Sequence, residues 1–299
     1  MLNFNYLHPT EFPELSSLTD FQASFRPLYT SENYAHFDEL PPSIGQAVVR
    51  ADNLQPLGLV GNRYKIAQNI DLYNMLTKAA RETLPANSLK GAELKEVASY
   101  GGAYTRFELS FPELVVPIHQ LGSETELKFR VGISNSFDGS GAVRVFAGAY
   151  DQVCENGMCI GDLVKQYARH TAGFTPHKFA SFITIEMDKY LTRARELQRW
   201  AKKEIAPDQA RTALEGAGLS ERKTNTMMDQ FYTEAAARGC TVWALYSALT
   251  FYSSHNSARF GVRNSARVDN QAAALDQRER EVSKIVNSKA WTSLIGEAA

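Results

Sequence analysis

The chain has 299 residues, of which 44% are hydrophobic and 22% charged, and a formal net charge of −1. This composition is that of a globular protein with room for one large domain or two ordinary ones, and it favours no class of charged partner. We expect a cytoplasmic protein without a membrane anchor, because no apolar run approaches the roughly 20 residues of a membrane-spanning helix, the N-terminus lacks a secretory signal, and three cysteines argue against a disulfide framework.

The first 45 residues predict an irregular N-terminal arm. They are rich in Pro, Ser and aromatic residues and show no clean periodicity. Their aromatic side chains are too numerous for a disordered tail, so we expect them to pack on the body of the protein or on an adjacent subunit.

Residues 46–162 predict a β-rich domain that contains one helix. Asn69 opens the helical stretch, where its side chain can cap the first turn, and Pro85 marks the end. Alternating residues predict strands over 93–99 and 104–111, joined through Gly101-Gly102, and a second hairpin over 127–149. With a segment over 153–160, the sequence predicts five or six strands, mostly antiparallel.

Residues 163–299 predict a helical region that packs on the sheet or on a neighbouring subunit. Apolar residues at three- and four-residue steps indicate helices over 179–201, 220–238, 241–256 and 267–287. Gly239 is a plausible C-cap between the second and third, and the last is typical of a docking helix. Strands followed by helices give an α+β fold class.

The hairpin over 127–149 carries the most informative polar pattern. Apolar residues point to one side, and the other side carries Lys128, Arg130 and Arg144 together with Phe146 and Tyr150. Cations that contact phosphates and rings that stack on bases are the chemistry of single-stranded DNA binding. An ordinary wet sheet face shows the same pattern, so both interpretations stay open.

Other basic clusters could extend such a track. Arg63 and Lys65 lie at a strand-to-helix junction, and Arg259 and Arg263 lie four apart in a segment without acidic residues. For each cluster the alternative is a solvated surface. The full candidate set for nucleic-acid binding is Arg63, Lys65, Lys128, Arg130, Arg144, Phe146, Tyr150, Arg259 and Arg263.

Catalytic and metal-binding patterns are weak. The turn Asp138-Gly-Ser-Gly141 lacks the spacing of a phosphate-binding loop. A zinc site could be assembled from Cys154, Cys159, His170 and His177, but the His spacing is outside the common range. The carboxylates Asp151, Glu155 and Asp162 match no metal-nuclease pattern. We expect no catalytic residue, no metal and no cofactor.

Several short motifs resemble one known family. They are Leu59-Val-Gly-Asn-Arg-Tyr-Lys65 with Gln68-Asn69, then Asn135-Ser-Phe-Asp-Gly-Ser-Gly-Ala142, Val153-Cys-Glu-Asn156 and Arg169-His-Thr171. In order and spacing they are similar to a phage/plasmid-like family catalogued as a domain of unknown function (number 932), over about residues 45–255. In outline that family is also similar to the single-strand annealing proteins of phage recombination, which form oligomers and need neither metal nor nucleotide.

These observations predict a single-stranded DNA-binding protein of phage or plasmid origin that promotes strand annealing as a homo-oligomer. The alternative is a protein-interaction module that acts on a host or defence factor through its N-terminal arm and C-terminal helix. A second alternative is a metal-dependent nucleic-acid enzyme built on Asp138, Asp151, Glu155 and the Cys/His group.

Overall fold

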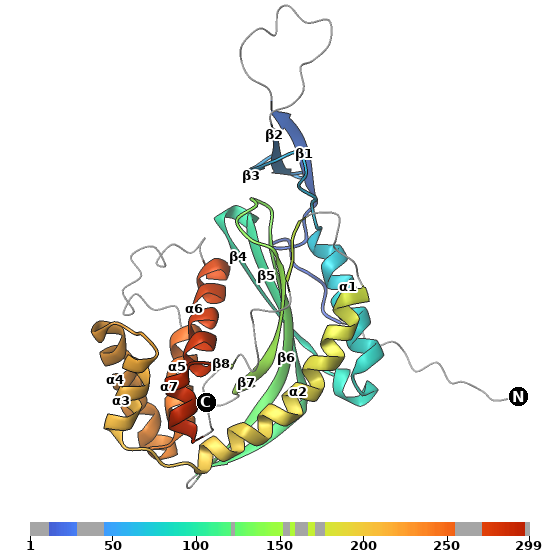
Figure 1. The fold of residues 1–299 in the computed structure, drawn as a ribbon. Helices are drawn as coiled ribbons and strands as arrows, with labels where there is room; N and C mark the ends of the chain where they lie inside the picture. The colour runs from blue at the N-terminus through green and yellow to red at the C-terminus, as the bar shows by residue number, and fades with distance from the viewer. Residues whose placement is uncertain are drawn as a thin grey trace, which may run out of the picture.

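The fold is α+β, as the order of elements in the sequence predicts (Figure 1). A computed structural model describes residues 12–28, 45–120, 123–151, 156–158, 167–170, 177–254 and 271–296. The strands are β1 (Ala23–Leu28), β2 (Gly45–Arg50), β3 (Pro56–Val60), β4 (Glu93–Ser99), β5 (Tyr104–Gln120), β6 (Ser123–Ser136), β7 (Val143–Asp151), β8 (Asn156–Met158) and β9 (Tyr167–Ala168). The α-helices are α1 (Asn69–Thr83), α2 (His177–Lys202), α3 (Pro207–Gly216), α4 (Glu221–Arg238), α5 (Val242–Ser254), α6 (Gln271–Val286) and α7 (Lys289–Ile295); two 3-10 helices are η2 (Ala86–Leu89) and η3 (Tyr100–Gly102).

The central sheet has the order β4-β5-β6-β7-β8, with β9 also paired to β7, and every pairing is antiparallel. Both predicted hairpins are present, the first through η3 and the second as β6–β7. Strand β5 extends to Gln120, beyond the predicted end at residue 111. The register shifts between Phe111 and Val115, where Pro112 has no N–H to donate to the ladder.

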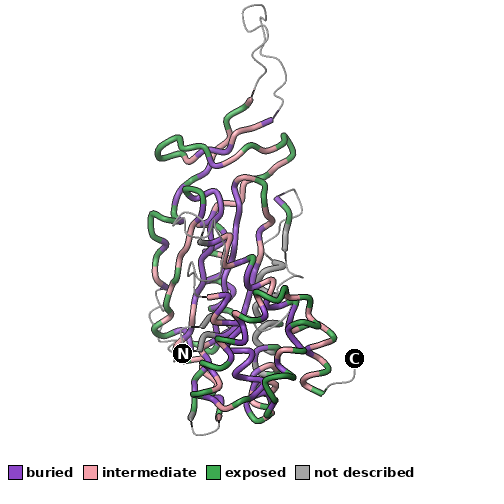
Figure 2. The backbone as a smooth tube through the Cα atoms, turned by 90° about the vertical axis from the view of Figure 1, so that its left-hand side faces the viewer, coloured by how far each residue is buried: buried purple, intermediate pink, exposed green. Residues whose placement is uncertain are grey.

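Helices cover both faces of this sheet (Figure 1). On the apolar face, Tyr73 of α1 packs against Phe107 at 5.8 Å between ring centroids, and Phe129 packs against Tyr190 of α2 at 5.1 Å. The Tyr190 hydroxyl also donates to the Leu127 carbonyl at 2.7 Å. The opposite face is covered by α6. A sheet enclosed in this way has no solvent-facing centre, and the buried residues follow its strands (Figure 2).

The remaining helices pack into an aromatic core beside the sheet. Trp200 lies 5.3 Å from Tyr246 and 5.5 Å from Trp291 between ring centroids, and Trp243 is fully buried. Helices α3 and α7 were not predicted. Pro207, which can be read from sequence as a helix break, is the first residue of α3, where its missing N–H would have had no helical partner.

The N-terminal segment is more regular than expected. Within residues 1–45, Ala23–Leu28 forms β1, which pairs antiparallel with β2, and β3 completes a second, three-stranded sheet. The first 11 residues and residues 29–44 lie outside the described part of the chain.

Two predicted helix ends have different outcomes. Gly239 ends α4 with a φ of 74°, which confirms its role as a C-cap. The capping role of Asn69 is wrong, because Gln68 is the N-cap of α1 and Asn69 is its buried first residue. The Asn69 amide is used for contacts across the fold instead.

Within the residues that the structure describes, no helix combines the length and apolar character that a membrane crossing requires.

Strand β3 rests directly on the turn between β6 and β7, and this contact generates a prediction about stability. A Cβ atom on Gly58 would lie 2.3 Å from the Asp138 Cα, whereas a Cβ on Gly61 would meet nothing within 4 Å. We expect Gly58→Ala to lower the free energy of unfolding by about 1–3 kcal/mol, because backbone must move to admit the methyl group. Gly61→Ala should stay within about 0.5 kcal/mol of the wild type. Urea denaturation of both variants measures the difference, and equal stability would contradict this packing.

Candidate functional site

Three of the four segments that carry the family resemblance converge at one end of the central sheet, and most of the fourth, Val153–Asn156, lies outside the described residues. The Tyr64 hydroxyl donates to the Ser136 carbonyl at 2.6 Å, and the Tyr64 ring stacks on His170 with centroids 4.7 Å apart. The Lys65 amide donates to the His170 carbonyl at 2.8 Å. Three motifs that are far apart in sequence therefore hold one another in place.

Buried amides complete this cluster. Asn135 donates to the Ala67 carbonyl and to the Asn69 side-chain oxygen, both at 2.9 Å. The Gln68 side chain makes two bonds with the backbone of Ala23 in β1, at 2.8 and 3.0 Å. The motif polar groups thus satisfy most of one another's hydrogen-bonding needs, although the buried Asn135 Oδ1 has no hydrogen-bond partner among the described residues. Their first role is to position the start of α1.

An open pocket of about 300 Å³ lies beside this cluster. Its polar lining residues are Lys65, Gln68, Asp71, Arg169 and His170, and its apolar ones are Ile66, Ala67, Leu72, Met75 and Val143. The side chains of Lys65 and Arg169 are exposed. A concave, largely apolar pocket with a few convergent polar groups is the usual form of a small-ligand site.

His170 supplies the most specific chemistry in this pocket. Its Nδ1 lies 3.1 Å from the Lys65 carbonyl oxygen, which can only accept, so Nδ1 carries the proton. Burial lowers the pKa of His170, against the opposing effects of that hydrogen bond and of Asp138. The ring is therefore neutral at pH 7, and Nε2 is an acceptor. Nε2 is buried and has no hydrogen-bond partner among the described residues.

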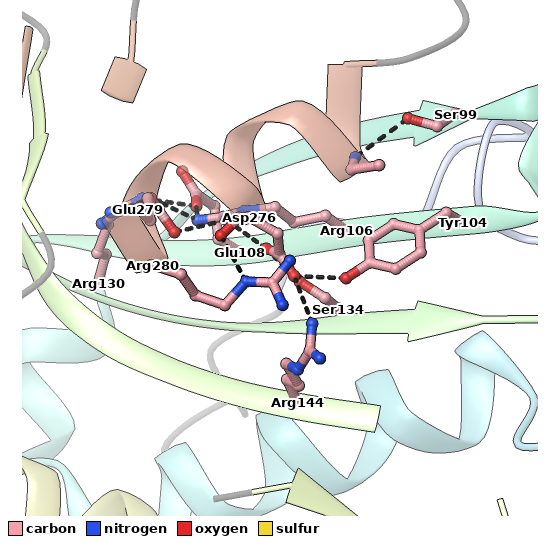
Figure 3. A network of polar contacts seen from close by, with 11 residues as sticks. Ser99, Tyr104, Arg106, Glu108, Arg130, Ser134, Arg144, Asp276, Glu279 and Arg280 are labelled. Carbon is pink, nitrogen blue, oxygen red and sulfur yellow. Dashed lines mark hydrogen bonds and ion pairs between the residues drawn. The ribbon is translucent and has the colours of Figure 1, made fainter. Parts of the chain in front are cut away.

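The second polar feature is a buried network between the central sheet and α6 (Figure 3). Arg106 of β5 donates to both carboxylate oxygens of Glu279, at 2.7 and 2.9 Å, and to Asp276 at 2.8 Å. Arg130 of β6 donates to Glu279 at 2.9 Å and to Glu108 at 2.8 Å. All five side chains are at most 7% exposed.

Further groups extend this network toward β7. Ser134 and the Tyr104 hydroxyl both donate to Asp276, and Arg144 lies 3.8 Å from the same carboxylate with 26% of its side chain exposed. Burial raises the pKa of Tyr104, and the charge of Asp276 raises it further, so this phenol stays a donor.

Phe146 is stacked inside the network. Its ring lies 3.8 Å from the Arg106 guanidinium carbon and 5.6 Å from that of Arg130, and the residue is 4% exposed. The ring occupies the space above Gly132 on the paired strand, where a Cβ would lie 2.3 Å from it. Gly132 therefore allows an aromatic ring to lie flat between strand and guanidinium, a cation–π arrangement.

The structure corrects the expectation that the polar face of the β6–β7 hairpin is open to water. Arg130 and Phe146 are buried because α6 covers them and supplies the carboxylates that pair with the arginines. Lys128 is less enclosed than these two residues: 20% of its side chain is exposed, and its Nζ lies 3.9 Å from Glu93. The side chain of Tyr150 lies outside the described part of the chain, although its backbone pairs with Lys128.

The other predicted cations fall into two groups, two that the structure describes and two that it does not. Arg63 and Lys65 are exposed beside the pocket, as a ligand-binding role requires. Arg259 and Arg263 fall in residues 255–270, which the structure does not describe. Arg169 is absent from the candidate set for nucleic-acid binding, although it belongs to the family motif Arg169-His-Thr171.

Most residues of the metal-site alternatives cannot be compared with the structure. Cys154, Glu155, Cys159 and Asp162 lie outside the described residues. Among the residues that are described, no three His, Cys, Asp or Glu side chains form a group that could hold a metal ion.

The network under α6 could have been anticipated from two spacings. Arg106 and Glu108 alternate on one face of β5, and Asp276 and Glu279 are three residues apart on one face of a helix. No local pattern, however, indicates that these two faces meet across about 170 residues of chain.

Fold and sites together define an α+β protein whose central antiparallel sheet is enclosed by helices on both faces and has a cation-lined pocket beside the start of α1. The chain belongs to the family described as a domain of unknown function (DUF932), which matches residues 56–278. Comparisons with curated proteins and with solved structures returned no match. The expected domain family is confirmed, whereas a phage or plasmid origin and the similarity to annealing proteins remain predictions.

The enclosed network predicts a strong dependence of stability on Glu279. We expect Glu279→Gln to lower the free energy of unfolding by about 3–5 kcal/mol, because it leaves buried arginines short of a counter-charge. Glu82→Gln on α1 is the matched control, since its pair with Lys78 is 3.9 Å apart and exposed, and should change stability by no more than about 0.5 kcal/mol. Urea denaturation at neutral pH compares the two. A Glu279→Gln variant as stable as the control would show that the network does not hold α6 in place.

The same carboxylate predicts a pH dependence. Burial alone would raise the pKa of Glu279, but Arg106 and Arg130 outweigh it and lower the pKa from 4.5 to about 2. A lowered pKa stabilises the fold at pH values above 4.5, and this contribution is lost as the pH falls from 4.5 toward 2. The stability gap between wild type and Glu279→Gln should therefore shrink across this window. Denaturation at several pH values measures it, and a constant gap would contradict the assignment.

Proposed function

We propose that this protein binds single-stranded DNA at the pocket beside the start of α1. Lys65 and Arg169 contact backbone phosphates, Arg63 extends the track, and one base enters the pocket. The observation that carries this proposal is the buried acceptor Nε2 of His170, which no described residue contacts by a hydrogen bond, beside a pocket lined by two exposed cations.

The pocket matches the chemistry of a nucleotide. Ile66, Leu72 and Met75 offer apolar surface to the faces of a base. His170 Nε2 requires a donor, which bases provide as ring N–H or exocyclic amino groups. Polyanion binding by cations beside an apolar platform is the common arrangement for single-stranded nucleic acid. Asp71 disfavours a phosphate deep inside the pocket, so the phosphates lie outside it, near the exposed cations.

Annealing and homo-oligomerisation belong to the same proposal. They rest on the outline shared with phage annealing proteins, strands followed by helices, which is an analogy of fold and does not fix function.

A protein-interaction module is the second candidate. Leu54, Leu59 and Tyr100 are 58%, 70% and 52% exposed, and β3 contacts η3. Large exposed apolar side chains near one another favour a contact with another protein. Under this alternative, charge changes at the pocket would leave partner binding intact, whereas Leu59→Ser would weaken it.

The proposed function predicts a defined response to charge removal. Lys65→Ala/Arg169→Ala should weaken binding to a fluorescent oligonucleotide and reduce the slope of log affinity against log salt by about 0.7 per lost contact. Lys90→Ala, an exposed cation beyond the far end of α1, is the control and should leave the slope unchanged. Fluorescence anisotropy at several salt concentrations measures both. Identical slopes in the double variant and the wild type would exclude this pocket as the phosphate contact.

A further inference from the structure

The contact between α6 and the central sheet is made mainly by charge. Toward the sheet α6 presents Asp276 and Glu279, both buried, and the Ala273 amide donates to Ser99 at 3.2 Å (Figure 3). Among the buried apolar residues of α6, the small Ala272 lies in the first turn, whereas Val282 and Ile285 lie farther along the helix and belong to the main apolar core. The half of α6 over the sheet is thus attached mainly through ion pairs.

The surface beneath α6 has an unusual composition for a sheet interior. We call Arg106, Arg130, Arg144 and Phe146 the covered strip. With Glu108 included, these side chains carry three positive charges against one negative, and Asp276 and Glu279 offset the difference of +2. Lys95 of β4 and Arg280 of α6 add positive charge at the margin of this group. An ion-paired interior gives little net stability over an apolar one, because desolvating the charges costs about as much as pairing them returns. Stability alone therefore does not explain these arginines.

The carboxylates of α6 sit where phosphate oxygens could sit. Glu279 bridges Arg106 and Arg130 with three bonds of 2.7–2.9 Å, and Asp276 bridges Arg106 and Ser134 at 2.8 Å each. Guanidinium groups make the same forked contacts with carboxylates and with phosphates. Phe146 stays stacked on Arg106 when α6 is displaced, because both side chains belong to the sheet, so its ring holds that guanidinium in place for a phosphate.

We propose that the covered strip is a second binding site for single-stranded nucleic acid, and that α6 occupies it as an internal mimic of the phosphate backbone. Binding requires the sheet-facing half of α6 to leave the strip, so α6 sets the affinity of the resting protein. This inference rests on the proposed function and extends it to a surface that is buried in the resting state.

Exchange of α6 for a polyanion is chemically balanced. Each arginine that loses a carboxylate gains a phosphate oxygen, so no buried cation is left without a counter-charge. An apolar contact between α6 and the sheet could not be exchanged in this way, because a polyanion has no apolar groups to replace those of the helix. The apparent affinity falls by the fraction of molecules in which the strip is open.

A reversible cross-link tests the inference without weakening the fold. Ser99 and Ala273 lie side by side, so Ser99→Cys/Ala273→Cys, with Cys154, Cys159 and Cys240 changed to serine, should join α6 to β4 on oxidation. If α6 leaves the strip in a minor open state, the oxidised form should bind a fluorescent oligo(dT) at least about ten-fold more weakly than the same protein after reduction. Each single cysteine variant is a control and should bind equally under both conditions.

A release variant tests the opposite direction. Asp276→Asn/Glu279→Gln, checked for folding by circular dichroism, should bind the same oligonucleotide about ten-fold more tightly than the wild type. Asp208→Asn/Glu215→Gln on α3 removes the same charge from exposed positions and should produce no such gain. Adding Arg144→Ala to the release variant should reduce its gain in affinity for the oligonucleotide.

The outcomes separate the two proposals. Equal binding by the oxidised and reduced forms overturns the covered strip, even if the release variant fails to fold, and leaves the pocket site standing. A gain in the release variant that survives Lys65→Ala/Arg169→Ala supports the strip as a site separate from the pocket, whereas a gain that these substitutions abolish overturns the strip. Absence of binding by the wild type, the reduced form and a folded release variant overturns both.

Discussion

The ion pairs between Arg106, Arg130 and Glu279 are the constraint on which the rest of the structure depends. Charges enclosed at this depth must find counter-charges, since an unpaired ion in a protein interior costs several kcal/mol. The positions of β5, β6 and α6 are therefore determined together. Helix α6 meets the polar face of the sheet through this contact, while α1 and α2 pack on the apolar face from the other side.

The family motifs serve mainly to build a scaffold. Tyr64, Gln68, Asn69 and Asn135 use their polar groups on one another and on the nearby backbone. What they leave available is His170 Nε2 and the two flanking cations of the pocket. A set of motifs can therefore identify a family clearly and still carry little direct chemistry, because most of its polar residues position the few that face a ligand.

Elements with strong local patterns could be predicted, and surfaces created by distant contacts could not. The alternation of apolar and polar residues identified both hairpins and the buried apolar side of β6. Apolar residues at helical spacing identified α1, α2, α4, α5 and α6. The side of the hairpin with Lys128, Arg130 and Phe146 looked open to water, because a charged strand face has the same pattern under solvent and under a charged helix. Helix α3 was missed because proline at a helix start and proline at a break look alike in sequence.

The length of chain between the two halves of the ionic network has a consequence during synthesis. Arg106 and Glu279 are 173 residues apart, so at about 5–20 residues per second the ribosome adds Arg106 roughly 10–35 s before Glu279. Until Glu279 is made, Arg106 and Arg130 have Glu108 of the same sheet as a counter-charge, and the carboxylates of α6 complete the pairing last.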